Sequence, residues 1–163
     1  MLNELKTARL TIRQFKPSDV DGLFKVLSDA DVMRYIEPPF DLEKTSGFIE
    51  KHGTCDNPRV FALIIDKSKT LIGHVIFHPY PTEELGFVNP YEIGFIIAKE
   101  FWRQGIASEI ADALIVYAKN NGIDGLVLEC DKENAAPIRI AGNFGFYLHE
   151  SDNNDLLTYF LPL

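Results

Sequence analysis

The stretch EIGFIIAKEFWRQGIASE, residues 92–109, decides the fold of this chain. Its first half is rich in β-branched and aromatic residues, which favours a strand over residues 91–98. A short turn that contains Gly105 follows, and an amphipathic helix over about residues 105–121 begins at once. A strand that runs through a small-residue turn into a helix indicates a sheet with helices packed against it.

Working outward, strand and helix patterns flank this unit on both sides. Alternation of apolar and polar residues predicts a strand at residues 10–15, and the apolar runs 60–65 and 71–77 predict a hairpin. Helices are predicted from Pro17 to residue 27 and over residues 42–52, the second with Asp41 as its cap. The C-terminal third is predicted to hold a strand, a short helix and closing strands, which begin at residue 125, near residues 134–137 and at residue 146. We therefore expect an α/β fold, with a mixed, mostly antiparallel sheet and helices on both faces.

Length and composition set the class of protein. The chain has 163 residues, 46% of them hydrophobic and 25% charged, which is typical of one globular domain, here expected over residues 1–163. The formal net charge of −8 argues against nucleic acid as a partner. It favours cationic partners such as amines or basic peptides, or serves solubility alone.

Cysteine content and hydropathy bear on location. Cys55 and Cys130 are too few for a disulfide framework or a structural zinc site, and Cys130 fits a buried strand position better than a nucleophile. No secretory leader and no apolar run long enough for a membrane span is visible in the sequence. We expect a cytoplasmic protein that does not engage a membrane.

The turn at residues 103–108 has the properties of an anion site. The first N–H groups of a helix have no partners within it, and the helix dipole adds partial positive charge. Gly105 and Ala107 leave the backbone open to close approach, and Arg103 can add a charge-assisted hydrogen bond. Tight packing alone also produces such a turn. The phosphate loops of nucleoside triphosphatases and of dinucleotide-binding folds are not matched.

This turn resembles the coenzyme A-binding motif of the GNAT superfamily of N-acetyltransferases, [QR]-x-x-G-x-[GA]. Here the motif reads WRQGIA, with Trp102 at the first position, a form that resembles the branch containing the ribosomal-protein N-terminal acetyltransferases. Further matches to that branch follow in order along the chain: RLTIR at 9–13, SD at 28–29, VMRY at 32–35, LIG at 71–73, EIGF at 92–95, Asn134, and GF at 145–146.

The resemblance implies a GNAT-like fold whose sheet is splayed at its central strands, and acetyl-CoA as the acyl donor. In the family the pantetheine arm pairs like an extra strand with main chain that corresponds to Ile96 and Ile97, and an N–H near Ile97 polarises the thioester carbonyl. Asn134 corresponds to a residue near the pantetheine, or serves only as a helix N-cap. The backbone amides that hold the diphosphate correspond to Arg103, Gln104, Gly105, Ile106, Ala107 and Ser108.

The implied reaction is direct acyl transfer from the thioester to a primary amine, either a protein N-terminal α-amine or a small amine. Such an amine is largely protonated near pH 7, so it must lose a proton before it attacks. We expect Glu92 to be the base, directly or through water; a solvated position or a salt bridge is the plain alternative. Pro137 and Ala141 stand where family members often carry a Ser or a Tyr that protonates the leaving thiolate. We therefore assign no general acid.

Other candidates concern the acceptor side. The resemblance places substrate contacts in a loop that is aromatic and broken by prolines, with Arg34, Tyr35 and Glu37 as candidates. His74 and His78 lie on one face of a strand without a cysteine or carboxylate at useful spacing, so we expect no metal site. One of these histidines could serve as a base on the substrate side. The simpler interpretation is that each is either hydrogen bonded within the protein or exposed to solvent, without a functional role.

Two other functions stay open at this point. One is a coenzyme A-binding regulatory module with weak or no catalysis, which the missing Ser and Tyr favour. The other is a nucleotide-binding protein. A monomer and a homodimer are both compatible with the sequence.

Overall fold

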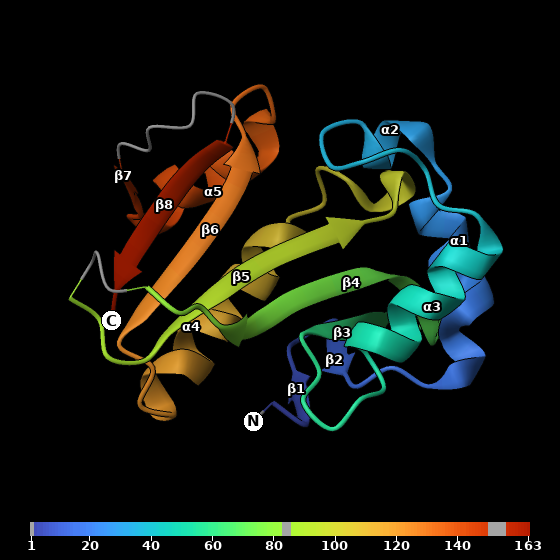
Figure 1. Ribbon diagram of the computed structural model, residues 1–163, viewed down its shortest axis with the longest axis horizontal. Helices are drawn as coiled ribbons and strands as arrows, with labels where there is room; N and C mark the ends of the chain where they lie inside the picture. The colour runs from blue at the N-terminus through green and yellow to red at the C-terminus, as the bar shows by residue number, and fades with distance from the viewer. Residues whose placement is uncertain (1, 83–85, 150–155) are drawn as a thin grey trace. The chain divides into compact units, whose positions relative to one another are not determined.

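Within residues 2–82, 86–149 and 156–163, which the computed structural model describes, eight strands form one sheet in the order β1-β2-β3-β4-β5-β6-β8-β7 (Figure 1). Its neighbouring strands β5 and β6 are parallel, whereas the pairs β1–β2, β2–β3, β3–β4, β6–β8 and β7–β8 are antiparallel. The predicted mixed, mostly antiparallel α/β fold is therefore confirmed.

The chain divides into two compact units. Unit 1 comprises Met1–Ile76 and Phe95–Ile106, and unit 2 comprises Phe77–Gly94 and Ala107–Leu163. Two strands, β4 (Thr70–Pro79) and β5 (Pro90–Ile97), contribute residues to both units.

Unit 1 is built on an antiparallel sheet of β1 (Glu4–Lys6), β2 (Leu10–Arg13), β3 (Val60–Ile65) and the first part of β4. The predicted β3–β4 hairpin is present, with a register shift between Leu63 and Ile64 that leaves an extra residue on β4. Strand β1 escaped prediction because its three residues, of which two are charged, show no apolar pattern.

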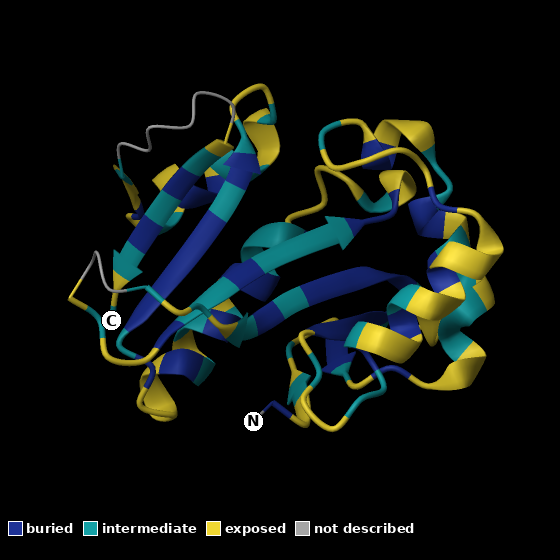
Figure 2. Ribbon diagram, viewed as in Figure 1, coloured by how far each residue is buried: buried dark blue, intermediate teal, exposed yellow. Residues whose placement is uncertain are grey.

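The helices of unit 1 pack onto this sheet. They are the 3-10 turns η1 (Pro17–Asp19) and η2 (Lys99–Phe101) and the helices α1 (Val20–Leu27), α2 (Ala30–Met33) and α3 (Leu42–His52). Asp41 caps α3 as predicted, its Oδ1 accepting from Lys44 N at 2.7 Å. Helices α1 and α3 each bury one side and expose the other (Figure 2). Their apolar sides form a core with β3, which includes Leu23, Leu27, Met33, Phe40, Ile49, Val60, Ala62 and Ile64.

Unit 2 contains α4 (Ile106–Asn120), β6 (Gly125–Asp131), α5 (Ala135–Phe144), β7 (Tyr147–His149) and β8 (Leu156–Pro162). Helix α4 covers one face of its strands, since the Phe77 ring of β4 lies 5.7 Å from the Tyr117 ring, centroid to centroid. Strands β5 and β6 pair from Pro90–Gly125 to Glu92–Val127. In the described part of unit 2, Ile93 and Gly94 have no register partner on β6, although β6 itself continues to Asp131.

Among the described residues, no helix has both the length and the apolar character that a membrane crossing requires.

Candidate active site

The segment between β5 and α4 turns sharply because two of its residues have left-handed backbone. Arg103 has φ 59° and Gly105 has φ 76°. A positive φ is uncommon for a residue with a side chain and costs about 1 kcal/mol or more. At Gly105 the same conformation carries no such cost. Helix α4 then begins at Ile106, one residue later than the sequence predicts.

The backbone N–H groups of this turn are available to a ligand. Residues 102–105 are exposed, and no hydrogen bond from the N–H of Arg103, Gln104 or Gly105 is found within the described residues. Ile106 and the next two residues form the first turn of α4, whose N–H groups have no acceptor inside the helix. A Cβ placed on Gly105 would meet only Arg9 Nη2, at 3.8 Å. The turn therefore offers both donors and room to an anion.

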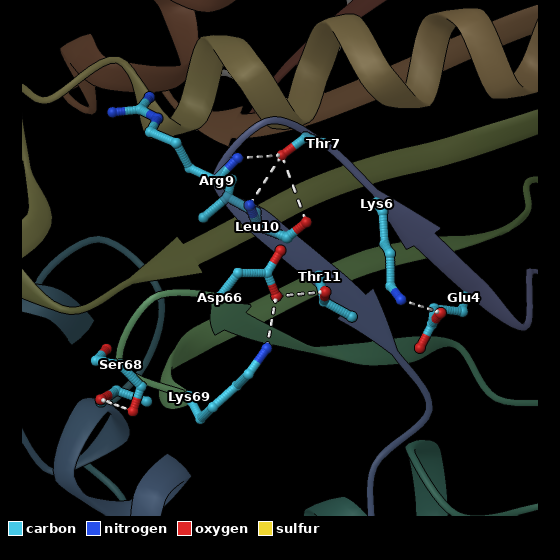
Figure 3. Close-up of polar contacts among 10 residues, drawn as sticks. Glu4, Lys6, Thr7, Arg9, Leu10, Thr11, Asp66, Ser68 and Lys69 are labelled. Atoms are coloured by element: carbon cyan, nitrogen blue, oxygen red, sulfur yellow. Dashed lines mark hydrogen bonds and ion pairs between the residues drawn. The ribbon is translucent and has the colours of Figure 1, made fainter.

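The side chain of Arg9 brings a positive charge to this turn, and the sequence did not predict a role for this residue. The Arg9 Nη1 donates to the Gln104 carbonyl oxygen at 3.1 Å. Arg9 lies between β1 and β2, where the Thr7 hydroxyl oxygen accepts from the N–H of Arg9 at 3.4 Å and of Leu10 at 3.0 Å (Figure 3). The Arg9 side chain therefore extends from a connection whose backbone is fixed by hydrogen bonds. Its signal in the sequence was the first residue of the RLTIR match, for which no role was inferred.

The end of β5 is fixed against β4 at a point of close approach. A Cβ placed on Gly73 would lie 1.9 Å from the Ile96 carbonyl oxygen, so this oxygen faces β4. Because a trans peptide is planar, the Ile97 N–H points the opposite way, away from β4. The indole Nε1 of Trp102 donates to the Ile97 carbonyl oxygen at 2.7 Å. Of the two residues expected to pair with pantetheine, Ile97 presents its N–H away from β4, whereas the carbonyl of Ile96 is turned toward Gly73.

Glu92 is not a solvated strand residue but one half of a pair. Its Oε2 lies 3.2 Å from the Nε2 of His78 on β4, and the two side chains are only 22% and 13% exposed. The other ring nitrogen of this histidine, Nδ1, lies 2.9 Å from the carbonyl oxygen of Pro79. The sequence singles out Glu92 and His78 separately and does not connect them, because the register between strands is not visible in one sequence.

A second polar group lies on the same sheet face of unit 2. The Tyr80 hydroxyl donates to Glu129 Oε1 at 2.9 Å, and the Thr158 hydroxyl lies 3.5 Å from the same oxygen. Glu129 follows Val127, the register partner of Glu92, by two residues, so both carboxylates project to one face. None of these three residues has a role that was predicted from the sequence.

Asn134 caps α5, and its Oδ1 accepts from Ala136 N at 3.4 Å. Of its two expected roles, the N-cap is the one with a described contact. Pro137 and Ala141 lie within α5, and Ala141 is fully buried. Neither side chain carries a hydroxyl group, so neither can protonate a leaving thiolate.

The three substrate candidates lie beyond α2 in unit 1. The Arg34 guanidinium carbon is 5.4 Å from the centroid of the Tyr35 ring. Glu37 Oε2 accepts from Lys44 Nζ of α3 at 2.6 Å. These residues and the turn up to Ile106 belong to unit 1, whereas Glu92, Ala107, Ser108 and Asn134 belong to unit 2.

Two further groups singled out in the sequence are buried. His74 is fully enclosed against Phe48, and loss of solvation lowers its pKa to about 4. Burial, and next the charge of Asp131, raise the pKa of the Cys130 thiol to about 11, which makes it a poor nucleophile. Among the described residues no group of three or more His, Cys, Asp and Glu side chains is arranged to hold a metal ion.

Comparisons with known proteins agree on one family. The family model described as the acetyltransferase (GNAT) domain matches residues 9–147. The uncharacterized N-acetyltransferase YnaD of Bacillus subtilis (strain 168) is 32% identical over 143 residues, which are 86% of this chain and 81% of YnaD. The crystal structure of a GNAT-family acetyltransferase from Bacillus anthracis matches with a TM-score of 0.83 and 28% identity, covering 98% of each chain.

A further solved structure bears on the fold alone. It is RimL, a ribosomal L7/L12 α-N-protein acetyltransferase in complex with coenzyme A, with a TM-score of 0.79 and 19% identity, covering 99% of this chain and 98% of RimL. The predicted resemblance is confirmed: the chain belongs to the GNAT acetyltransferase family and is an acyl-CoA-dependent N-acetyltransferase.

Proposed function

We propose that this protein transfers an acetyl group from acetyl-CoA to a primary amine, and that residues 103–108 hold the diphosphate of the donor. The observation that carries the proposal is the turn itself, with its exposed N–H groups, the open side of Gly105 and the Arg9 guanidinium beside the Gln104 carbonyl. A helix N-terminus combined with a guanidinium suits a diphosphate in both geometry and charge.

The end of β5 is proposed to receive the thioester. Bound acetyl-CoA supplies an activated carbonyl carbon. The Ile97 N–H, directed away from β4, is the group proposed to donate to the thioester oxygen as negative charge develops there. Trp102 supports this role, since its hydrogen bond to the Ile97 carbonyl ties the strand end to the turn. Ile96 is proposed to contribute its side chain only, because its carbonyl faces Gly73.

Glu92 is proposed as the base that takes a proton from the amine, directly or through water. Support comes from its place on β5, five residues before Ile97, and from its partial exposure of 22%. A carboxylate that still reaches solvent can pass its proton on after each turnover.

The acceptor is proposed to be a cation in its resting form, either a protein N-terminus or a small amine. Its ammonium group suits a chain with a formal net charge of −8. Arg34, Tyr35 and Glu37 stay candidates for acceptor contacts. The protein is further proposed to act in the cytoplasm as one domain, as a monomer or a homodimer.

The test compares coenzyme A with pantetheine, which lacks the diphosphate and the adenosine 3′-phosphate attached to it, by titration calorimetry. We expect the wild-type protein to bind coenzyme A at least about a hundredfold more tightly, because several charge-assisted hydrogen bonds are involved. Gly105→Trp should abolish that difference. The matched control is Gly122→Trp, which follows the other end of α4, has φ 70° and has no atom within 4 Å of its Cβ position. Equal losses in the two variants would remove the turn from the proposal.

Catalysis is tested separately by release of coenzyme A thiol from acetyl-CoA with short peptides bearing a free α-amine and with small primary amines. Turnover of either class supports the transferase. Tight binding without turnover of any acceptor would favour the regulatory module, and displacement of coenzyme A by ATP would favour a nucleotide-binding protein.

A further inference from the structure

From the geometry of unit 2 we infer that His78 and Glu92 share one proton and take up the amine's proton as a pair, with His78 as the positioning and proton-storing partner of Glu92. This inference rests on the proposed function, in which Glu92 meets the amine. It adds a residue that the reaction needs and that no motif of the sequence identifies.

The first step is the fixed geometry of the pair. His78 lies on β4 and Glu92 on β5, and these strands are hydrogen bonded two positions further along, from Tyr80 N to the Pro90 carbonyl at 2.8 Å. The Nε2–Oε2 distance is 3.2 Å, and both side chains are largely buried. Two rigid neighbouring strands therefore hold the two groups together.

The second step is a count of protons. The Pro79 carbonyl oxygen has no proton to give, so the His78 Nδ1, 2.9 Å away, carries one and donates it. In a neutral ring Nε2 then has only a lone pair, which faces a carboxylate oxygen that also only accepts. Without a further proton the 3.2 Å contact joins two acceptors. One added proton turns it into a charge-assisted hydrogen bond.

The third step concerns the surroundings. Among the described residues, other titratable groups on this face of unit 2 are Tyr80, which follows β4, Glu129 and Asp131 of β6, and Tyr147 and His149 of β7, the register partners of Phe160 and Thr158. Tyr80 and Glu129 bond to one another at 2.9 Å, and Asp131 Oδ1 accepts from Glu133 N at 2.8 Å. On β8 this face carries Thr158, which does not titrate. The Tyr117 side chain of α4 contacts Phe77, on the opposite face. Tyr80, Glu129 and Asp131 each have a described partner outside the pair, whereas the described contact of the Glu92 carboxylate is the one with His78.

The step balances as follows. The ammonium nitrogen gives one proton to the site between Oε2 and Nε2, and the neutral amine attacks the thioester carbon. As the C–N bond forms and the C–S bond breaks, the nitrogen loses its second proton and the thiolate gains one, which yields an amide and a thiol. The pair then releases its proton to water through the exposed part of Glu92.

The experiment measures kcat against pH from 5 to 9, at saturating acetyl-CoA and with the best acceptor of the panel above. In His78→Gln, which keeps a donor toward Glu92 but no stored proton, we expect the acidic limb of the profile to lie at lower pH than in the wild type and the maximum to be about tenfold lower. Tyr80→Phe, two residues after His78 and on the same face, should leave the limb in place. An unmoved limb in His78→Gln would overturn the inference.

A second readout does not depend on turnover. Nitrogen NMR of the free protein should show His78 keeping protons on both ring nitrogens to a higher pH in the wild type than in Glu92→Gln. The same titration midpoint in both proteins would overturn proton sharing. If the midpoints differ but coenzyme A does not bind, proton sharing is supported and the proposed function fails. If coenzyme A binds but the midpoints are equal, the proposed function is supported and proton sharing fails.

Discussion

At the scale of single residues, Arg9 is the side chain whose removal most directly tests the charge at the cofactor turn. Its guanidinium reaches the Gln104 carbonyl from the β1–β2 connection. We predict that Arg9→Ala weakens coenzyme A binding about tenfold, which is about 1.4 kcal/mol, and leaves pantetheine binding unchanged. The measurement is titration calorimetry with both ligands.

The control for this substitution is Lys6→Ala in the same hairpin. Lys6 also carries a positive charge, but its Nζ lies 3.1 Å from Glu4 Oε1 (Figure 3). An equal loss of affinity in both variants would mean that net charge, and not the position of Arg9, governs binding.

The burial of His74 predicts how the free energy of unfolding depends on pH. Its pKa is lowered to about 4 in the folded protein by burial, against about 6.5 in an unfolded chain. The Nδ1 atom is buried with no hydrogen-bond partner among the described residues. Between pH 6.5 and 4 the unfolded chain binds a proton that the folded chain excludes. The free energy of unfolding therefore falls as the pH drops, by about 3 kcal/mol at most from this residue.

Urea unfolding at several pH values measures this effect. His74→Leu should flatten the decline below pH 6.5. His52→Leu, at the other histidine in contact with the Phe48 ring, should not. The same decline in wild type and His74→Leu would show that other groups govern acid sensitivity.

At the scale of secondary structure, Gly73 controls how β5 ends. It has φ 151°, and a Cβ there would lie 1.9 Å from the Ile96 carbonyl oxygen. We predict that Gly73→Ala lowers the free energy of unfolding by about 2–5 kcal/mol, through backbone strain and the clash together. Thermal or urea unfolding measures the loss.

Gly47→Ala in α3 is the counterpart, because nothing lies within 4 Å of its Cβ position. Removing a helical glycine there should raise the free energy of unfolding by about 0.5–1 kcal/mol. A Gly73→Ala protein as stable as the wild type would contradict the close approach of β4 and β5.

Elements with strong local patterns were predicted well. Strand β3 and helix α3 have the predicted bounds, because an unbroken apolar run and an Asp cap are local signals. Strand β1 and helix α2 were missed. Each is only three or four residues long and is held by partners distant in sequence or by the Asp29 cap, so periodicity does not reveal them. Strand β5 and helix α4 begin within one residue of the predicted positions.

In the candidate site too, the residues with a local sequence signal were predicted and those that depend on distant contacts were not. The turn at residues 103–108 was identifiable because its signal is contiguous: small residues between a strand and a helix. Arg9 and His78 were not, since Arg9 reaches the turn from 95 residues away and His78 meets Glu92 through strand register. Contacts of this kind depend on how strands pair, which one sequence does not encode locally.

At the scale of the whole molecule, the formal net charge of −8 predicts how acceptors are approached. A cationic peptide should be acetylated with a kcat/KM that falls as salt rises from 0.05 to 0.5 M, because screening removes long-range attraction. A peptide of zero net charge should change little. We expect a decline of about three- to tenfold for the cationic peptide, measured by thiol release. Equal salt dependence for both peptides would show that the charge serves solubility alone.

The most direct measurement of the central claim is a crystal structure of the protein with bound coenzyme A. We predict that the diphosphate oxygens accept hydrogen bonds from N–H groups of residues 103–108, with the Arg9 guanidinium beside them. A diphosphate bound elsewhere, with these N–H groups facing only water, would contradict the account.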